Sequence, residues 1–150
     1  MLYIAHRGNT HGRDDMENVP EYLMFALYEG YDVEVDIWWV KGDFWFGHNG
    51  PDYELKPEWF TLCPERVWYH CKNAKALIKL QQMGVPCFGH REDSYVMTSN
   101  GYVWMHPQAM LVDGAIICLP EQSKYKKDLS RMAGICSDHI AGYKEHYETV

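Results

Sequence analysis

The chain has 150 residues, of which 47% are hydrophobic and 23% are charged, and its formal net charge is −7 at pH 7. These values exclude the disordered, collagen-like and coiled-coil classes and are typical of a single globular domain spanning residues 1–150. No run of Lys or Arg is longer than the pair Lys126-Lys127, so we expect no surface that binds nucleic acid or anionic lipid.

Cysteine usage and hydropathy indicate the compartment. The five cysteines form no CxxC pair and their number is odd, which favours reduced thiols over a secreted disulfide framework. The N-terminus has no apolar segment of signal-peptide length, and no stretch approaches the roughly 18 apolar residues of a membrane span. We therefore expect a soluble cytoplasmic protein.

Apolar periodicity and turn residues divide the chain into short elements. We predict strands over residues 2–5, 31–40, 44–48, 67–72, 85–88, 95–97, 102–104, 114–119 and 133–136, and helices over residues 20–29, 57–62, 74–83 and 125–132. Asn18 is predicted to start the first helix and Asn73 to cap the third. Asn100-Gly101 is typical of the tight turn of a β-hairpin.

The order of these elements predicts the fold class. Strands that alternate with helices indicate parallel βαβ units. Eight such units in 150 residues would have about 19 residues each, whereas one unit usually needs nearer 30. We therefore expect an α/β fold, an abbreviated TIM-like (β/α) barrel with several helices shortened or missing. Missing helices would expose apolar sheet, which leaves a homodimer as an alternative to a monomer.

Two carboxylates share one face of the strand predicted over residues 31–40. Period-two alternation places Glu34 and Asp36 on the face opposite Val33, Val35 and Ile37. Unpaired anions on a core strand would cost several kcal/mol, so a cation should lie between them. Carboxylate pairs are hard-oxygen ligands for Mg²⁺, Mn²⁺ or Ca²⁺. The alternative is an edge strand whose polar face is solvated.

Four further residues suit chemistry at the same ends of the strands. His6 and His48 each close a predicted strand, and two imidazoles beside a metal suit general acid–base catalysis near neutral pH. Arg7 and Lys72 are candidates for binding phosphate oxygens. Each residue alone is as well explained by a structural histidine or a solvated cation, so the prediction depends on the combination.

The motifs occur in an order that resembles the glycerophosphodiester phosphodiesterase family of the phospholipase-C-like phosphodiesterases. They are His6-Arg7-Gly8, Glu17-Asn18, Glu34-Val35-Asp36, His48 and Lys72, with a weaker match at Ser137-Asp138 in the closing strand. The resemblance implies a TIM-like barrel, one divalent metal bound by Glu34 and Asp36, and His6 and His48 as the acid–base pair. It also places Glu17 at the site.

The chain departs from the family pattern at several positions. His70 stands where the family usually carries a glutamate two residues before the lysine. An imidazole there would shift the metal preference from Ca²⁺ toward Mn²⁺ or another transition metal. Asn49 follows His48 where an aspartate is common, and Val19 replaces a threonine.

A second polar group follows a later strand. It consists of His90, Arg91, Glu92 and Asp93, with Trp104, His106 and Ser137-Asp138 further along the chain. If these strand ends converge, the group can line a pocket that selects a polyol or sugar by stacking and hydrogen bonding. The alternative is a solvated loop and a core tryptophan.

Together these patterns predict a small metal-dependent phosphodiesterase that hydrolyses a glycerol- or sugar-linked phosphodiester. The expected cofactor is one Mg²⁺, Mn²⁺ or Ca²⁺ ion, with Mg²⁺ or Mn²⁺ favoured. The expected residues are His6 and His48 for catalysis, Glu34, Asp36 and His70 for the metal, and Arg7, Lys72, Glu17 and Trp104 for substrate. The rival interpretation is a non-catalytic module that binds phosphate or sugar phosphate on a degenerate barrel.

Overall fold

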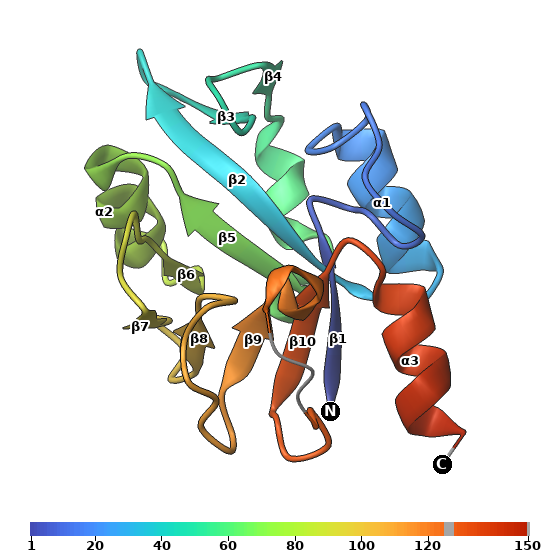
Figure 1. The fold of residues 1–150 in the computed structure, drawn as a ribbon. Helices are drawn as coiled ribbons and strands as arrows, with labels where there is room; N and C mark the ends of the chain where they lie inside the picture. The colour runs from blue at the N-terminus through green and yellow to red at the C-terminus, as the bar shows by residue number, and fades with distance from the viewer. Residues whose placement is uncertain (125–127, 150) are drawn as a thin grey trace.

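A long central strand, β2 (Asp32–Val40), organises a curled, mixed β-sheet in the computed structural model, which describes residues 1–124 and 128–149 (Figure 1). The other strands are β1 (Leu2–His6), β3 (Asp43–Phe46), β4 (Tyr53–Glu54), β5 (Val67–Cys71), β6 (Cys87–Phe88), β7 (Tyr95–Met97), β8 (Val103–Met105), β9 (Ile116–Cys118) and β10 (Gly134–Ser137). The helices are α1 (Pro20–Tyr28), α2 (Ala74–Gln82) and α3 (Ile140–Glu148), and three 3₁₀ turns are η1 (Pro57–Thr61), η2 (Pro64–Arg66) and η3 (Pro120–Gln122).

The pairing of the strands places an opening beside β2. The sheet order is β4-β3-β2-β1-β10-β9-β8-β7, and β5 pairs with the other edge of β2 and continues to β6. On the first edge, β1 pairs with β2 as far as His6 opposite Glu34, and β3 takes over from Phe46 opposite Ile37. The ladder is therefore interrupted between Glu34 and Ile37, where β1 ends, and Asp36 stands at the gap.

The predicted abbreviated TIM-like barrel is wrong. The described residues form a curled half-barrel with three short helices, and β3, β4 and β7 are antiparallel to their neighbours. The connections from β8 to β9 and from β9 to β10 contain no α-helix among these residues. The Asn100-Gly101 turn, with Gly101 at φ 91°, returns the chain antiparallel, as its sequence predicts. Within the described residues no ladder joins β6 to β7, the strand at the other end of the sheet, so the sheet does not close.

Individual elements follow the predictions more closely than the closure of the sheet does. Asn73 caps α2 by accepting a hydrogen bond from the backbone N of Ala76 at 3.0 Å, which confirms its predicted role. Asn18 does not cap α1, because Val19 holds the cap position without a side-chain hydrogen bond. The helix predicted over 125–132 lies partly outside the described residues, and residues 128–132 are not helical. Helix α3 was not predicted.

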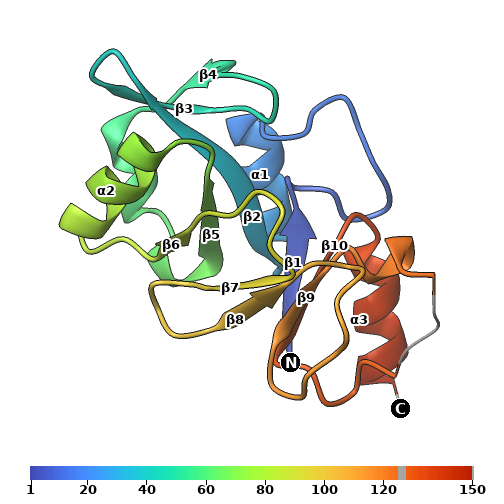
Figure 2. The ribbon, with the colours of Figure 1, turned by 60° about the vertical axis from the view of Figure 1, so that its left-hand side comes forward.

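Two apolar clusters stabilise the curled sheet. The helices pack on its outer side, where Leu23, Leu80 and Ile140 are fully buried (Figure 2). On the inner side, Phe88 and Trp104 stack with ring centroids 4.5 Å apart. These side-chain contacts join β6 to β8, between which no backbone ladder forms in the described residues. Burying each large apolar side chain contributes about 1.5–3 kcal/mol.

Three sequence expectations concern the environment and assembly. No helix among the described residues is long and apolar enough to cross a membrane. The five cysteines are free thiols, of which Cys71, Cys87 and Cys136 are buried and Cys63 and Cys118 are partly buried. The homodimer stays a prediction, and the edge strand β7 presents exposed Tyr95 and Met97 side chains.

Candidate functional site

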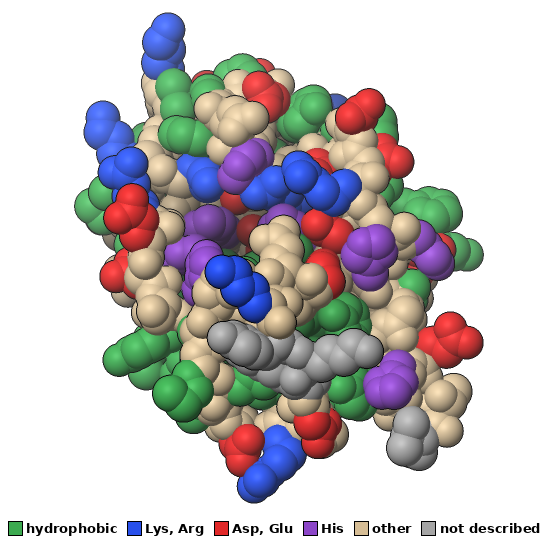
Figure 3. Space-filling view, viewed as in Figure 1, with side chains coloured by type: hydrophobic (Ala, Val, Ile, Leu, Met, Phe, Trp, Pro, Cys, Tyr) green, Lys and Arg blue, Asp and Glu red, His purple; other side chains and the backbone are tan. Residues whose placement is uncertain are grey.

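A cavity of about 1030 Å³ opens at the carboxyl ends of β1 and β5, beside the middle of β2. Histidine and cationic side chains gather around a hollow on the face seen in Figure 3. Seven of the nine predicted site residues line the cavity: His6, Arg7, Glu34, His48, His70, Lys72 and Trp104. The parallel pairing of β1, β2 and β5 brings these strand ends together, even though the sheet is not a closed barrel.

Glu34 and His70 line the floor of the cavity, and the buried side chain of Asp36 contacts them there without lining it. The pairing of β2 with β5 places Asp36 opposite His70. Nδ1 of His70 lies 3.1 Å from Oδ1 of Asp36 and 3.6 Å from Oε1 of Glu34. Both carboxylates are 1% exposed, and one ligand atom from each of the three residues lies within 4.8 Å of the others. Their convergence brings together a donor set that can hold a divalent metal.

The two oxygens of Asp36 have different surroundings. Oδ2 accepts a hydrogen bond from Nδ2 of Asn18 at 3.0 Å and lies 3.0 Å from Nε of Arg7. Oδ1 is buried and accepts no hydrogen bond from any described residue. Burial would raise the pKa of Asp36, but the nearby ring nitrogens of His48 and His70 and the charge of Arg7 hold it well below its usual range. Asp36 is therefore an anion with one oxygen directed at His70.

Asn18 positions Asp36 rather than starting a helix. Its φ is 65°, and its Oδ1 accepts a hydrogen bond from the backbone N of Asp36 at 3.0 Å while its Nδ2 donates to the Asp36 side chain. Asparagine tolerates this left-handed conformation better than most residues. The prediction that Asn18 starts the helix is therefore wrong, and its hydrogen bonds with Asp36 explain its role.

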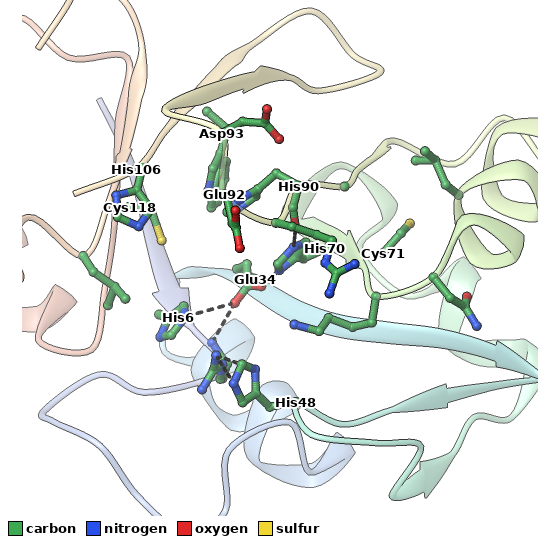
Figure 4. A pocket seen from close by; sticks show the side chains of 18 of the residues that line it. His6, Glu34, His48, His70, Cys71, His90, Glu92, Asp93, His106 and Cys118 are labelled. Carbon is green, nitrogen blue, oxygen red and sulfur yellow. Dashed lines mark hydrogen bonds and ion pairs between the residues drawn. The ribbon is translucent and has the colours of Figure 1, made fainter. Parts of the chain in front are cut away.

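His6 is paired with Asp138 at the end of β10. Its Nδ1 donates to Oδ1 of Asp138 at 2.7 Å, and its Nε2 lies 3.8 Å from Oε2 of Glu34 (Figure 4). Burial would lower the pKa of His6, but the hydrogen bond with Asp138 and the charge of Glu34 raise it to about 9. Asn9 donates to the same Asp138 oxygen at 2.9 Å and accepts a hydrogen bond from Tyr22. The sequence analysis did not predict Asn9 as a site residue. The only local indication is that it is a polar residue three positions after His6.

Arg7 joins the mouth of the cavity to its floor. Its backbone N donates to Oε2 of Glu34 at 3.2 Å, and its φ of 53° returns the side chain over β2. The guanidinium donates to Glu17 at 3.1 Å and to Nδ1 of His48 at 2.7 Å. Glu17 does not line the cavity and instead holds Arg7. Lys72 adds a second cation, with Nζ 3.8 Å from Oδ1 of Asp36.

The structure places most residues of the second predicted polar group at the cavity and the others outside it. His90, Arg91, Glu92, Asp93 and His106 line the cavity on the side away from His48, and Trp104 lies among them. Trp104 is 2% exposed and belongs to the inner apolar cluster, so it serves as core and as cavity wall. Ser137 lies outside the cavity lining, where its hydroxyl donates to Glu121 at 2.9 Å.

Comparison of the chain with protein-family models, curated proteins and solved structures finds no match. The family resemblance thus stays an expectation drawn from the motifs. The function is argued below from the geometry of the cavity.

The pairing of His6 with Asp138 predicts a pH dependence of stability in the metal-free protein. The folded pKa values of His6 and His70 are about 9, above the unfolded value of about 6.5. Their stabilising contribution is complete below pH 6.5 and disappears as the pH rises through 9. We expect the free energy of unfolding, measured with urea in a chelator, to contain a decline across this range, and Asp138→Asn to remove the His6 part of it. Equal pH slopes in wild type and Asp138→Asn would contradict the pairing.

Proposed function

We propose that the chain is a metal-dependent phosphodiesterase that hydrolyses a glycerol- or sugar-linked phosphodiester. The observation that carries the proposal is the convergence of Glu34, Asp36 and His70 at the floor of one cavity, with His6 and His48 each beside a carboxylate. A binding module needs cations and donors for phosphate, but it does not need two titratable groups flanking a metal site.

The side chains on the cavity floor fit a divalent metal. Two buried carboxylates and an imidazole are suitable ligands, and the unpartnered Oδ1 of Asp36 is a buried acceptor that a cation would satisfy. When bound there, a divalent ion would supply Lewis-acid polarisation of a phosphoryl oxygen.

The remaining side chains divide the work of hydrolysis. Arg7 and Lys72 bind the phosphate oxygens and offset the charge that builds on them. Of His6 and His48, one takes a proton from the nucleophile and the other gives a proton to the leaving oxygen. Asp138 holds the ring of His6 with Nε2 toward the cavity. The free thiols support a further part of the proposal, that the protein works in the reducing cytoplasm.

The test is hydrolysis of an aryl phosphodiester and of a panel of glycerophosphodiesters by the purified protein. Each substrate is tested with Mg²⁺, Mn²⁺, Ca²⁺ or chelator, for wild type and Glu34→Ala, and His146→Ala on the exposed face of α3 serves as a control. We expect turnover that needs metal and that is abolished by chelator and by Glu34→Ala, but not by His146→Ala. No turnover with any metal, together with retained phosphate binding, would instead support the binding module.

A further inference from the structure

His70 is oriented in the way that proteins orient a metal-binding histidine. Its Nδ1 faces the oxygens of Asp36 and Glu34, and its Nε2 lies 3.4 Å from the backbone carbonyl oxygen of His90. A carbonyl oxygen can only accept, so Nε2 carries the proton of this hydrogen bond. In neutral His70 the lone pair is then on Nδ1, directed at the carboxylates. A second nitrogen bound to a backbone carbonyl is the usual outer support of a histidine ligand.

The plane of the His70 ring is fixed as well. The ring stacks on Phe88 with centroids 5.1 Å apart and an interplanar angle of 0°. It also stacks on the neighbouring ring of His90 (Figure 4), with centroids 4.8 Å apart and an angle of 8°. The pairing of β5 with β6 places His70 opposite Phe88, so the stack is built by the sheet. Because the ring is held by its stacking on these two neighbouring rings, whose centroids are 6.3 Å apart, and by the contact at Nε2, Nδ1 is preorganised toward the two carboxylates.

An ion pair between His70 and the carboxylates is the simpler explanation of this geometry. It leaves one atom unexplained, because Oδ1 of Asp36 lies 3.1 Å from Nδ1 and still accepts no hydrogen bond from the described chain. Nδ1 faces oxygens of both carboxylates rather than forming an aligned bond with that one. A cation shared by Nδ1 and the two oxygens satisfies all three atoms.

We infer that this centre selects a divalent transition metal, such as Co²⁺ or Zn²⁺, over Mg²⁺ and Ca²⁺, and that His70 is the discriminating ligand. Imidazole nitrogen suits transition metals, whereas Mg²⁺ and Ca²⁺ prefer oxygen ligands throughout. The inference rests on the proposed metal site. It replaces the expectation of Mg²⁺ or Mn²⁺ with a later transition metal.

Metal binding tests this selectivity without any measurement of turnover. The metal-free protein is titrated with Co²⁺ and with Mg²⁺ at one fixed pH by calorimetry, and the visible spectrum of bound Co²⁺ reports nitrogen ligation. We expect Co²⁺ to bind at least about 10-fold more tightly than Mg²⁺. His70→Glu should lose about 10-fold or more of the Co²⁺ affinity and keep its Mg²⁺ affinity. His146→Glu, which makes the same exchange on the exposed face of α3, should behave as wild type.

The outcomes separate this inference from the proposed activity. Equal affinities for Co²⁺ and Mg²⁺ in wild type, or an unchanged ratio in His70→Glu, would overturn the selectivity even if a diester is hydrolysed. Tight Co²⁺ binding through His70 without turnover would retain the selectivity and refute the phosphodiesterase. If His70→Glu does not fold, histidine ¹⁵N spectra of wild type with and without Zn²⁺ decide the question. Binding must then shift the Nδ1 signal of His70 and leave His146 unchanged, and an unshifted His70 would refute the inference.

Discussion

Replacing His6 with alanine is expected to lower the turnover of a phosphodiester by about 10²- to 10⁴-fold, the usual contribution of a general acid or base. The imidazole is held by Asp138 at 2.7 Å, and its second nitrogen faces the cavity beside Glu34. Because His6 is not among the three clustered side chains proposed to bind the metal, metal affinity should change far less than kcat. Steady-state kinetics and calorimetric metal titration of the same variant measure the two effects separately.

The matching variants distinguish catalysis from structure. His48→Ala should also lower kcat, since His48 is the second half of the proposed acid–base pair. Asp138→Asn should act through His6, with a smaller loss of kcat and a pH–rate profile displaced to lower pH because the pKa of His6 falls. Turnover that is unchanged in both His6→Ala and His48→Ala would remove the acid–base assignment, whatever metal is bound.

Sequence patterns predicted the parts of the site that depend on local geometry. The alternation within β2 correctly placed Glu34 and Asp36 on one face, because side chains of a strand alternate regardless of the rest of the fold. The ends of β1 and β5 placed His6 and His70 at the same side, because neighbouring parallel strands end together. The position of a residue along a strand was thus sufficient to predict the carboxylate pair, whereas His70 was included as a metal ligand from the family resemblance.

Long-range packing determined what the sequence did not predict. The open, curled shape of the sheet depends on the antiparallel hairpin of β7 and β8 and on side-chain stacking of Phe88 on Trp104 across the gap, and these contacts join segments that no local pattern relates. The neighbours of Asn18 in the chain predicted a helix start, which is wrong. Its partner in the structure, Asp36, lies 18 residues away in the sequence. Only the folded sheet brings such pairs together.

Asp36 and Glu34 are both proposed metal ligands, but the structure gives them unequal roles in the metal-free protein. Asp36 lies within 4 Å of cationic or ionisable groups of Arg7, His48, His70 and Lys72. By the same measure, Glu34 lies near the side chains of two histidines, His6 at 3.8 Å and His70 at 3.6 Å. Removing one partner from a buried ion pair leaves the other charge buried and uncompensated. The loss of stability then exceeds the stability that the pair itself contributed.

Asp36→Asn is therefore expected to destabilise the metal-free protein by about 3–5 kcal/mol, because the partly buried Arg7 and His70 lose their common, buried anion. Glu34→Gln should cost less, since it leaves Arg7 paired with Asp36 and Glu17. Urea unfolding in chelator at pH 7 measures both losses. Repeating the measurement with saturating Co²⁺ should stabilise wild type, while neither variant should gain as much. Equal stability of Asp36→Asn and wild type in chelator would show that Asp36 is not the anion that holds these cations.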